Sequence, residues 1–257
     1  MNGDTQVMLV VGGTGSIGGE IVRQALDAGW SVIVQGREAE KLDTFLQAMA
    51  SRCSSVQRVR GIKADITDGA DAVEAMVQAA AGRFGRLDAV VDCLVTGPAQ
   101  GGITGAFEST DPRAYLPFAE LSIVYLERLA FAVLPWLKKT RGCLVTLASD
   151  AALFPAPRQT LLGAARAAAV GFVKNLAVEV ARDGVRVHCV SPCYVEGTAT
   201  ARRLEAAGSE RLARARKRAG LGLPGAGDIA PLVLFLCGDG ARRMTGQVIS
   251  VNGGLNV

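Results

Sequence analysis

Aromatic side chains and histidine are scarce in this chain. Aromatics account for 5% of its 257 residues, and His188 is its one histidine. His188 lies between Val187 and Cys189 in an apolar run, so we expect a satisfied, neutral core residue rather than a base. The six cysteines include no Cys-x-x-Cys pair, which leaves a zinc site and a disulfide scaffold without support. We therefore predict buried, reduced thiols and no metal site.

Long apolar segments and strong net charge are missing as well. No apolar run reaches the roughly 18 residues that a membrane span needs, and residues 1–13 lack the basic and apolar stretches of a secretion signal. The net charge of +4 is too weak to imply nucleic-acid binding without a dense basic stripe. These absences favour a cytoplasmic protein that acts on a small-molecule substrate, with no nucleic-acid or membrane partner.

What the chain does have is glycine, 31 residues of it, and alternating apolar and amphipathic segments. Short apolar runs predict strands at Val7–Val11, Trp30–Val34, Ser55–Ile62, Ala89–Leu94, Cys143–Ala148, Val185–Val190 and Gln247–Val251. Amphipathic stretches predict helices at Ser16–Ala28, Glu38–Ser51, Asp68–Phe84, Pro112–Lys139, Gln159–Arg182, residues 198–218 and Asp228–Leu236. This alternation, with no Pro- or Ser-rich linker, predicts one α/β domain over residues 1–257, a Rossmann-type doubly wound parallel sheet of about seven strands.

A glycine-rich turn joins the first predicted strand to the first predicted helix. Its sequence, Gly-Gly-Thr-Gly-Ser-Ile-Gly, spaces Gly12, Gly15 and Gly18 three apart. The first glycine permits the tight turn, the second lets backbone N–H groups approach a pyrophosphate, and the third lets the helix pack on the strand. The helix N-terminus then stabilises the phosphate charge. The residues expected to contact the dinucleotide here are Gly12, Thr14, Gly15, Ser16, Ile17 and Gly18.

The end of the second predicted strand indicates which dinucleotide binds. A carboxylate at this position would bind the ribose 2′-hydroxyl of NAD. Here the strand ends in Gln35-Gly36-Arg37, and Arg37 can pair with a 2′-phosphate through its fork of donors. The alternative is an Arg37 solvated beside Glu38. The sequence favours NADP(H).

At this point the chain resembles the short-chain dehydrogenase/reductase family over essentially its whole length. The residues that carry the resemblance are Ala64–Ile66, Leu87–Val91, Gly184–Val187 with Ser191-Pro192, Met244–Val248 and Val251–Gly254. The resemblance implies that Asp65 and Ile66 hold the adenine ring. It implies further cofactor contacts from Cys93, Leu94, Pro192, Val195 and Thr198, a substrate-covering segment at residues 195–226, and a homodimer or homotetramer. Long apolar faces for such an assembly lie in Leu121–Leu137 and Ala164–Val180, although these faces could instead pack on the sheet.

The catalytic positions depart from the family pattern. The family's serine matches Ser149, but its tyrosine and lysine fall on Leu162 and Arg166, and its helix asparagine falls on Ser122. The Asn-Asn-Ala-Gly loop after the fourth strand reads Asp-Cys-Leu-Val here, at residues 92–95. Leu162 has no exchangeable proton, so the family's acid chemistry cannot run from this position. Arg166 keeps donors for the nicotinamide ribose, but it cannot act as an acid at neutral pH.

Two other side chains are candidate proton donors. Tyr194 follows the sixth strand, next to the expected nicotinamide site, and its alternative is simple packing. Asp150 follows Ser149, and a carboxyl in a dry pocket can be protonated near neutrality; its alternative is a solvated loop carboxylate or helix cap. Tyr125 we expect to pack at a helix interface, and Cys193 has no evident base partner. The full set of candidate catalytic residues is Ser149, Arg166, Asp150, Tyr194 and Ser122.

Residues 202–218 are strongly basic, which indicates either a cationic cover for an anionic substrate or, as the sequence favours, a solvated helix face. The sequence leads first to an atypical NADP(H)-dependent reductase or dehydrogenase acting on a carbonyl, an imine or an activated alkene. A non-redox cyclase, isomerase or dehydratase on the same fold is the second hypothesis. A catalytically inactive binding protein is the third.

Overall fold

The computed structural model describes residues 5–52, 56–69, 71–94 and 102–256. Its centre is one sheet of seven parallel strands in the order β3-β2-β1-β4-β5-β6-β7. The strands are β1 (Val7–Val11), β2 (Ser31–Gly36), β3 (Val59–Lys63), β4 (Ala89–Asp92), β5 (Cys143–Leu147), β6 (Arg186–Pro192) and β7 (Val248–Val251). The order reverses at β1, so the second half of the sheet grows from β4 on the other side. The predicted α/β fold class is confirmed.

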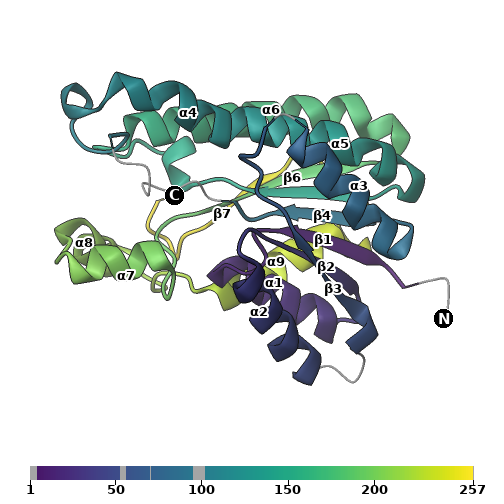
Figure 1. Cartoon of the computed structure of the whole chain (residues 1–257). Helices are drawn as coiled ribbons and strands as arrows, with labels where there is room; N and C mark the ends of the chain where they lie inside the picture. The colour runs from purple at the N-terminus through teal and green to yellow at the C-terminus, as the bar shows by residue number, and fades with distance from the viewer. Residues whose placement is uncertain (1–4, 53–55, 70, 95–101, 257) are drawn as a thin grey trace.

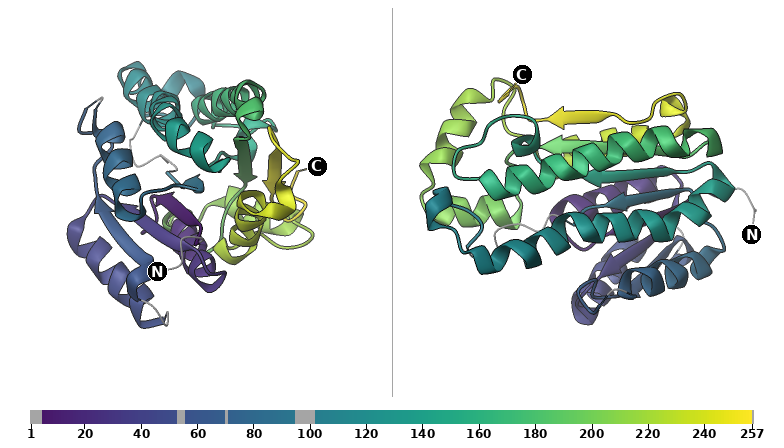
Figure 2. Two further views of the ribbon diagram at one scale, coloured as in Figure 1. Left: turned by 90° about the vertical axis from the view of Figure 1, so that its right-hand side faces the viewer. Right: turned by 90° about the horizontal axis from the view of Figure 1, so that it is seen from above.

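Helices cover both faces of this sheet (Figure 1, Figure 2). One layer holds α3 (Ala72–Phe84), α4 (Tyr115–Ala119), α5 (Tyr125–Thr140) and α6 (Thr160–Val180). The other holds α1 (Ser16–Asp27), α2 (Ala39–Arg52) and α9 (Ala226–Cys237). The short helices α7 (Ala199–Ala206) and α8 (Glu210–Arg218) lie apart from both layers, beyond the carboxyl ends of the strands.

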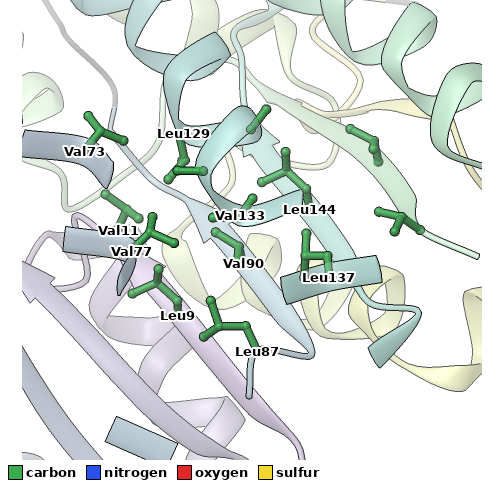
Figure 3. Close-up of a cluster of buried hydrophobic side chains, with 14 of the residues drawn as sticks. Leu9, Val11, Val73, Val77, Leu87, Val90, Leu129, Val133, Leu137 and Leu144 are labelled. Atoms are coloured by element: carbon green, nitrogen blue, oxygen red, sulfur yellow. The ribbon is translucent and has the colours of Figure 1, made fainter. Parts of the chain in front are cut away.

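Two apolar cores form because the central strands are buried on both faces. In β1, Leu9 and Val11 pack toward α3 and α5, while Met8 and Val10 pack toward α1 and α9. Figure 3 shows the first core, where Leu129 and Val133 of α5 lie over the sheet. Strands with apolar side chains on both faces are the expected form for a parallel sheet between two helical layers.

The chain is helical throughout Pro112–Thr140, so the long helix predicted at Pro112–Lys139 is confirmed in extent, but its hydrogen-bond pattern is not uniform. The chain forms a 3₁₀ turn at Pro112–Ala114, then α4, then a π-helical turn at Glu120–Val124, and only then α5. A π turn inserts an extra residue into the helical hydrogen-bond ladder and is found often at functional sites. The turn here contains Ser122, the position aligned with the family's helix asparagine.

The other predicted elements match the observed ones to within a few residues, with two differences. The third strand begins at Val59, after a 3₁₀ turn at Val56–Arg58, and the predicted start at Ser55 lies outside the described residues. The helical stretch at 198–218 is two helices, because Gly208 takes a φ of 61° and Ser209 caps α8 by accepting the N–H of Leu212.

One segment, Thr160–Asp183, is long and apolar enough by composition to cross a membrane. It contains α6, and Val173 and Ala177 of this helix are fully buried in the core formed with β6 and α5. The core helix of an α/β domain passes the same test of length and composition, and the burial of this face explains its apolar sequence.

Candidate functional site

The glycine-rich turn is held at the carboxyl end of β1 by a buried glutamine. Gln35, at the end of β2, accepts a hydrogen bond from the Gly12 N–H at 2.8 Å and donates to the Ala64 carbonyl at 2.6 Å. One side chain therefore ties together the ends of β1, β2 and β3. Sequence analysis missed this role, because the two partners lie 23 and 29 residues away along the chain.

Glycine is required at two positions of this turn. Gly12 has a φ of 71°, a conformation that side-chain-bearing residues rarely adopt. A Cβ on Gly18 would lie 2.5 Å from the Gly12 carbonyl oxygen and 2.9 Å from the Gly13 Cα. These contacts allow α1 to start directly against the turn. Its first turn has no capping side chain and no acidic residue, so its N–H groups remain open to an anion.

A cleft of about 530 Å³ lies in front of this turn. All of the predicted cofactor residues except Pro192, Val195 and Arg166 line it. The predicted residues that do so are Gly12, Thr14, Gly15, Ser16, Ile17, Gly18, Arg37, Asp65, Ile66, Cys93, Leu94 and Thr198. Its position at the carboxyl ends of β1, β2 and β4, where the strand order reverses, is where doubly wound sheets bind ligands.

The end of the cleft at β2 holds two cations, Arg37 and Lys41, beside the carboxylates of Glu38 and Asp65. Arg37 is 66% exposed, and its guanidinium lies 3.8 Å from Glu38 and 3.9 Å from Asp65, longer than a direct hydrogen bond. Lys41, one helical turn further along α2, lines the same end and was missed from the sequence. Two long cations with free donors fit a phosphate group better than a ribose hydroxyl.

Asp65 is held as a carboxylate at this end of the cleft. Its Oδ1 accepts hydrogen bonds from the Thr67 N–H at 3.0 Å and the Thr67 hydroxyl at 2.7 Å. Partial burial opposes ionisation, but these two donors and the charge of Arg37 together lower the pKa of Asp65. The side chain is therefore an ionised acceptor at the expected adenine position.

A second pocket, of about 260 Å³, adjoins the cleft and contains the altered catalytic positions. Ser149, Leu162, Tyr194, Pro192 and Val195 line it together. The Ser149 hydroxyl also accepts the N–H of Ala151 at 3.3 Å, so it caps the turn after β5 while facing the pocket. Leu162, the position at which the sequence comparison expected the family's tyrosine, gives this wall an apolar surface.

Asp150 is buried, so the expectation of a solvated carboxylate is wrong. It is 4% exposed, and its oxygens accept hydrogen bonds from four side chains. These donors are Ser191 at 3.4 Å, Ser250 at 2.5 Å, Asn252 at 2.6 Å and Asn256 at 3.3 Å. A carboxylate whose lone pairs are filled in this way anchors the C-terminal residues to the end of β5 and β6. Such a network favours a structural role over proton donation.

Arg166 does not reach the cleft. It is 2% exposed and lies beneath the pocket, where Nη1 donates to the Leu147 carbonyl at 3.4 Å. Its Nε and Nη2 have no hydrogen-bond partner among the described residues. Burial lowers the pKa of this guanidinium, and the nearby charge of Asp92 opposes that shift. The charge of Asp92 is therefore close enough to act on Arg166, although the two side chains form no direct ion pair in the described part of the chain.

Asp92 is the centre of a buried polar group at the end of β4. It is 3% exposed and accepts the Thr146 hydroxyl at 2.8 Å and the Leu94 N–H at 3.1 Å. Burial raises the pKa of Asp92, and Thr146, Leu94 and Arg166 counteract that shift. Burial and the nearby charge of Asp92 raise the pKa of the Tyr125 phenol well above its ordinary value. The Tyr125 hydroxyl makes no hydrogen bond of normal geometry within the described residues. Ser122 is also buried and lines neither cavity.

Two further candidates are held in their neutral forms. Burial raises the pKa of the Cys193 thiol to about 11, which leaves it a poor nucleophile at neutral pH. Burial and the charge of Arg186 lower the pKa of His188 to about 4. His188 is fully buried as expected; the Met244 backbone counteracts the lowering of its pKa, although neither ring nitrogen makes a hydrogen bond of normal geometry within the described residues. Over the same residues, no cluster of three His, Cys, Asp or Glu side chains could hold a metal ion.

Comparison with known proteins agrees with this geometry. A family model described as enoyl-(acyl carrier protein) reductase matches residues 12–256. The 4-formylbenzenesulfonate dehydrogenase of Comamonas testosteroni is 31% identical over the full length of both chains, which are covered to 100% each. The 3-oxoacyl-[acyl-carrier-protein] reductase of Chlamydia trachomatis is 27% identical, and the match covers 96% of each of the two chains.

Two solved structures illustrate the similarity in fold. The NADPH-bound structure of a short-chain oxidoreductase from Pseudomonas aeruginosa, described as containing an atypical catalytic center, superposes with a TM-score of 0.88. Its sequence is 28% identical, and the match covers 98% of this chain and 96% of that one. A dehydrogenase/reductase from Mycobacterium ulcerans also superposes with a TM-score of 0.88, at 24% identity and with 97% and 89% of the two chains covered, which shows the shared fold.

Proposed function

The chain belongs to the short-chain dehydrogenase/reductase family of oxidoreductases, and from this we propose that it binds NADP(H) and reduces or oxidises a small organic substrate without the usual tyrosine acid. The observation that carries the proposal is the cleft in front of the glycine-rich turn, with Arg37 and Lys41 at its β2 end. The Pseudomonas relative, which binds NADPH around an atypical centre, supports it.

In this proposal the fold supplies three contacts to the cofactor. Backbone N–H groups at the start of α1 hold the pyrophosphate, Asp65 and Ile66 flank the adenine, and Arg37 with Lys41 pairs with the 2′-phosphate. When bound, the cofactor supplies or accepts the hydride, and the protein contributes orientation and a dry pocket. Pro192, Val195 and Ser149 line the pocket in which the reacting carbon would lie.

The missing acid limits the substrate class. With Leu162 in place of a proton donor and Asp150 filled by four donors, Tyr194 and water remain as proton sources in the pocket. Substrates that need less help from an acid at the hydride step fit this pocket best. An iminium ion is already cationic, and an activated alkene accepts hydride to give a delocalised anion. A carbonyl polarised by Ser149 is the third possibility.

The experiment is a titration with NADPH and NADH, followed by cofactor fluorescence. We expect NADPH to bind at least tenfold more tightly than NADH. Replacing either Arg37 or Lys41 by Gln should weaken NADPH binding roughly tenfold. The reason is that a charge-assisted hydrogen bond contributes about 1.5–3 kcal/mol. NADH affinity should stay unchanged, and Lys174→Gln, an exposed α6 position away from the cleft, is the charge-matched control. Equal affinity for the two cofactors in the unmodified protein would contradict the proposal.

One observation favours a second function on the same scaffold. Apart from Tyr194 and the Cys193 thiol, none of the residues lining the small pocket can readily supply a proton, so a non-redox reaction or simple ligand binding would also suit it. Turnover of a substrate panel with NADP⁺, or with no cofactor, would identify a cyclase, isomerase or dehydratase. Binding of NADPH with no turnover of imines, alkenes or carbonyls would indicate a binding protein.

A further inference from the structure

A cavity of about 580 Å³ lies beside the small pocket and opens onto α8. The two share five lining residues, namely Ser149, Gln159, Cys193, Tyr194 and Arg211. A ligand whose reacting carbon faces Ser149 can therefore extend from the small pocket into this second cavity. The cofactor cleft lies on the other side of the small pocket, so the second cavity remains available to the substrate.

The lining of this cavity is strongly cationic. Four arginines border it: Arg158 from the loop after β5, and Arg211, Arg214 and Arg218 from α8. Two carboxylates also border it, which leaves an excess of two positive charges. One of these carboxylates, Asp150, is buried and bonded to serine and asparagine side chains.

The arginines of this cavity are only partly neutralised by the protein. Glu210 pairs with Arg214 at 3.5 Å, one turn along α8. Arg158 and Arg211 form no ion pair in the described part of the chain, and Arg211 is half-buried. Arg216 differs, because Glu196 and Glu205 hold it at 2.8 and 2.9 Å, and it does not line the cavity. The same short helix thus satisfies one arginine with carboxylates and leaves another with free donors.

The backbone holds Arg158 at the cavity in a strained conformation. Its φ is 68°, and Arg158 is one of two non-glycine residues with positive φ in the described part of the chain. The Gly105 N–H donates to its carbonyl at 3.0 Å, which fixes the loop. Residues in this conformation persist where the surrounding structure stabilises them, and they cluster at ligand sites.

We propose that this cavity is an anion subsite, so that the substrate is a small organic acid that carries its reacting carbon and a carboxylate or phosphoryl group at opposite ends. Arg158 and Arg211 hold the anionic group by charge-assisted hydrogen bonds, and the apolar pocket holds the reacting end. This inference rests on the proposed function for the reaction, but the anion preference is a property of the cavity alone.

Only part of the basic helix is solvated. Leu212 and Ala215 of α8 are buried and seat the helix on the domain, so that Arg211, Arg214 and Arg218 border the cavity. Arg214 and Arg218 are exposed, as the sequence favoured for this segment, whereas Arg211 is half-buried. Arg211 is therefore the arginine of α8 that a solvated helix face does not explain.

The test compares matched aromatic aldehydes that differ only in the group opposite the aldehyde. Calorimetric titration of the NADP⁺-saturated protein with 4-formylbenzoate, 4-formylphenyl phosphate and the neutral 4-formylbenzamide gives the three dissociation constants. We expect at least one anion to bind at least tenfold more tightly than the amide, and the tighter of the two anions shows whether carboxylate or phosphoryl is preferred. The preference should shrink with added salt, because exposed charges are screened.

Three variants locate the subsite. Arg158→Gln and Arg211→Gln should each lose most of the anion preference, whereas Lys217→Gln removes the same charge from α8 at an exposed position outside the cavity and should keep it. Equal binding of anion and amide, absence of binding by both anions, or loss of the preference in Lys217→Gln would overturn the inference. NADP⁺ binding is titrated first, and its failure would overturn the proposed function instead. Melting temperatures of all variants show that they are folded.

Discussion

At the scale of single residues, the feature that sets this site apart is two buried side chains of opposite charge, Asp92 and Arg166, which lie near each other without a direct ion pair in the described structure. Both side chains are at most 3% exposed, and each carries a charge that the other helps to hold in the core. Such a pair is no evidence of high stability, since its desolvation opposes its attraction. Removing one partner has a large effect, because the other is then left charged and buried.

Asp92→Asn tests the pair directly. We expect this variant to lose about 1–3 kcal/mol of unfolding free energy, the typical loss when a buried polar partner is removed and the remaining groups are left uncompensated. The double variant Asp92→Asn with Arg166→Met should recover part of that loss, because no buried charge remains. Urea denaturation of the three proteins measures the effect, and an unchanged midpoint for Asp92→Asn would show that Arg166 draws its compensation from elsewhere.

His188 makes stability depend on pH. Its pKa is about 4 in the folded protein and about 6.5 when unfolded, so between these values the unfolded chain binds more protons. Stability contributed by the neutral imidazole is therefore present above pH 6.5 and is lost as the pH falls toward 4. The loss is at most about 3 kcal/mol. Denaturation of His188→Gln between pH 7 and pH 4.5 should show a smaller decrease than the parent protein, and parallel curves would refute the assignment.

At the scale of elements, the contact between the glycine-rich turn and α1 determines the shape of the cleft. Gly18→Ala would place a methyl group 2.5 Å from the Gly12 carbonyl, and both are backbone-fixed. We expect a loss of about 2 kcal/mol, typical of overpacking, together with weaker NADPH binding because the turn must shift. Gly82→Ala in α3 is the control, since a Cβ there meets nothing within 4 Å and alanine favours a helix. Thermal denaturation and NADPH titration of both variants give the comparison.

The elements that could be predicted from the sequence are those set by nearby residues. The spacing of Gly12, Gly15 and Gly18 in one short segment was enough to predict the turn, the start of α1 and the position of the cleft. The strands were predictable because a strand buried on both faces is a continuous apolar run. The ends of helices followed from local signals such as Gly29, which takes a φ of 93° after α1.

Features that depend on distant partners could not be predicted in this way. Gln35 contacts residues from two other strand ends, and the burial of Arg166 depends on Asp92, which comes from a different strand. The π-helical turn between α4 and α5 has no local sequence signal of the kind that glycine gives. Asp150 illustrates the same point, since its four donors come from β6, β7 and the C-terminal residues. The candidate catalytic roles of Ser149, Tyr194 and Arg166 stay predictions.

At the scale of the whole molecule, the apolar residues of α5 and α6 serve both alternatives considered for them, packing on the sheet and exposure on an outer face. One side of each helix packs on the sheet, where Leu129 and Val173 are fully buried. The other side leaves Phe131 and Val178 exposed at 77% and 78%. Large apolar side chains at such exposure on neighbouring helices favour a contact between copies of the chain.

A test of assembly follows from these two positions. We expect the protein to run as a dimer or tetramer in light scattering after size exclusion, and Phe131→Glu combined with Val178→Glu to reduce its mass toward that of one chain. The change places charges on surface positions, so the fold and NADPH binding should persist. A monomer in the unmodified protein would rule out the assembly.

The apolar side chain of Leu162 and the buried guanidinium of Arg166 have a consequence for any attempt to restore the family's tyrosine and lysine at these two positions. A tyrosine restored at 162 would find no lysine ammonium one turn along, and a lysine restored at 166 would leave Asp92 facing a shorter, more strongly hydrated cation in a dry core. Either substitution alone leaves a polar group without its expected partner, so we expect that neither introduces the family's proton-transfer chemistry by itself.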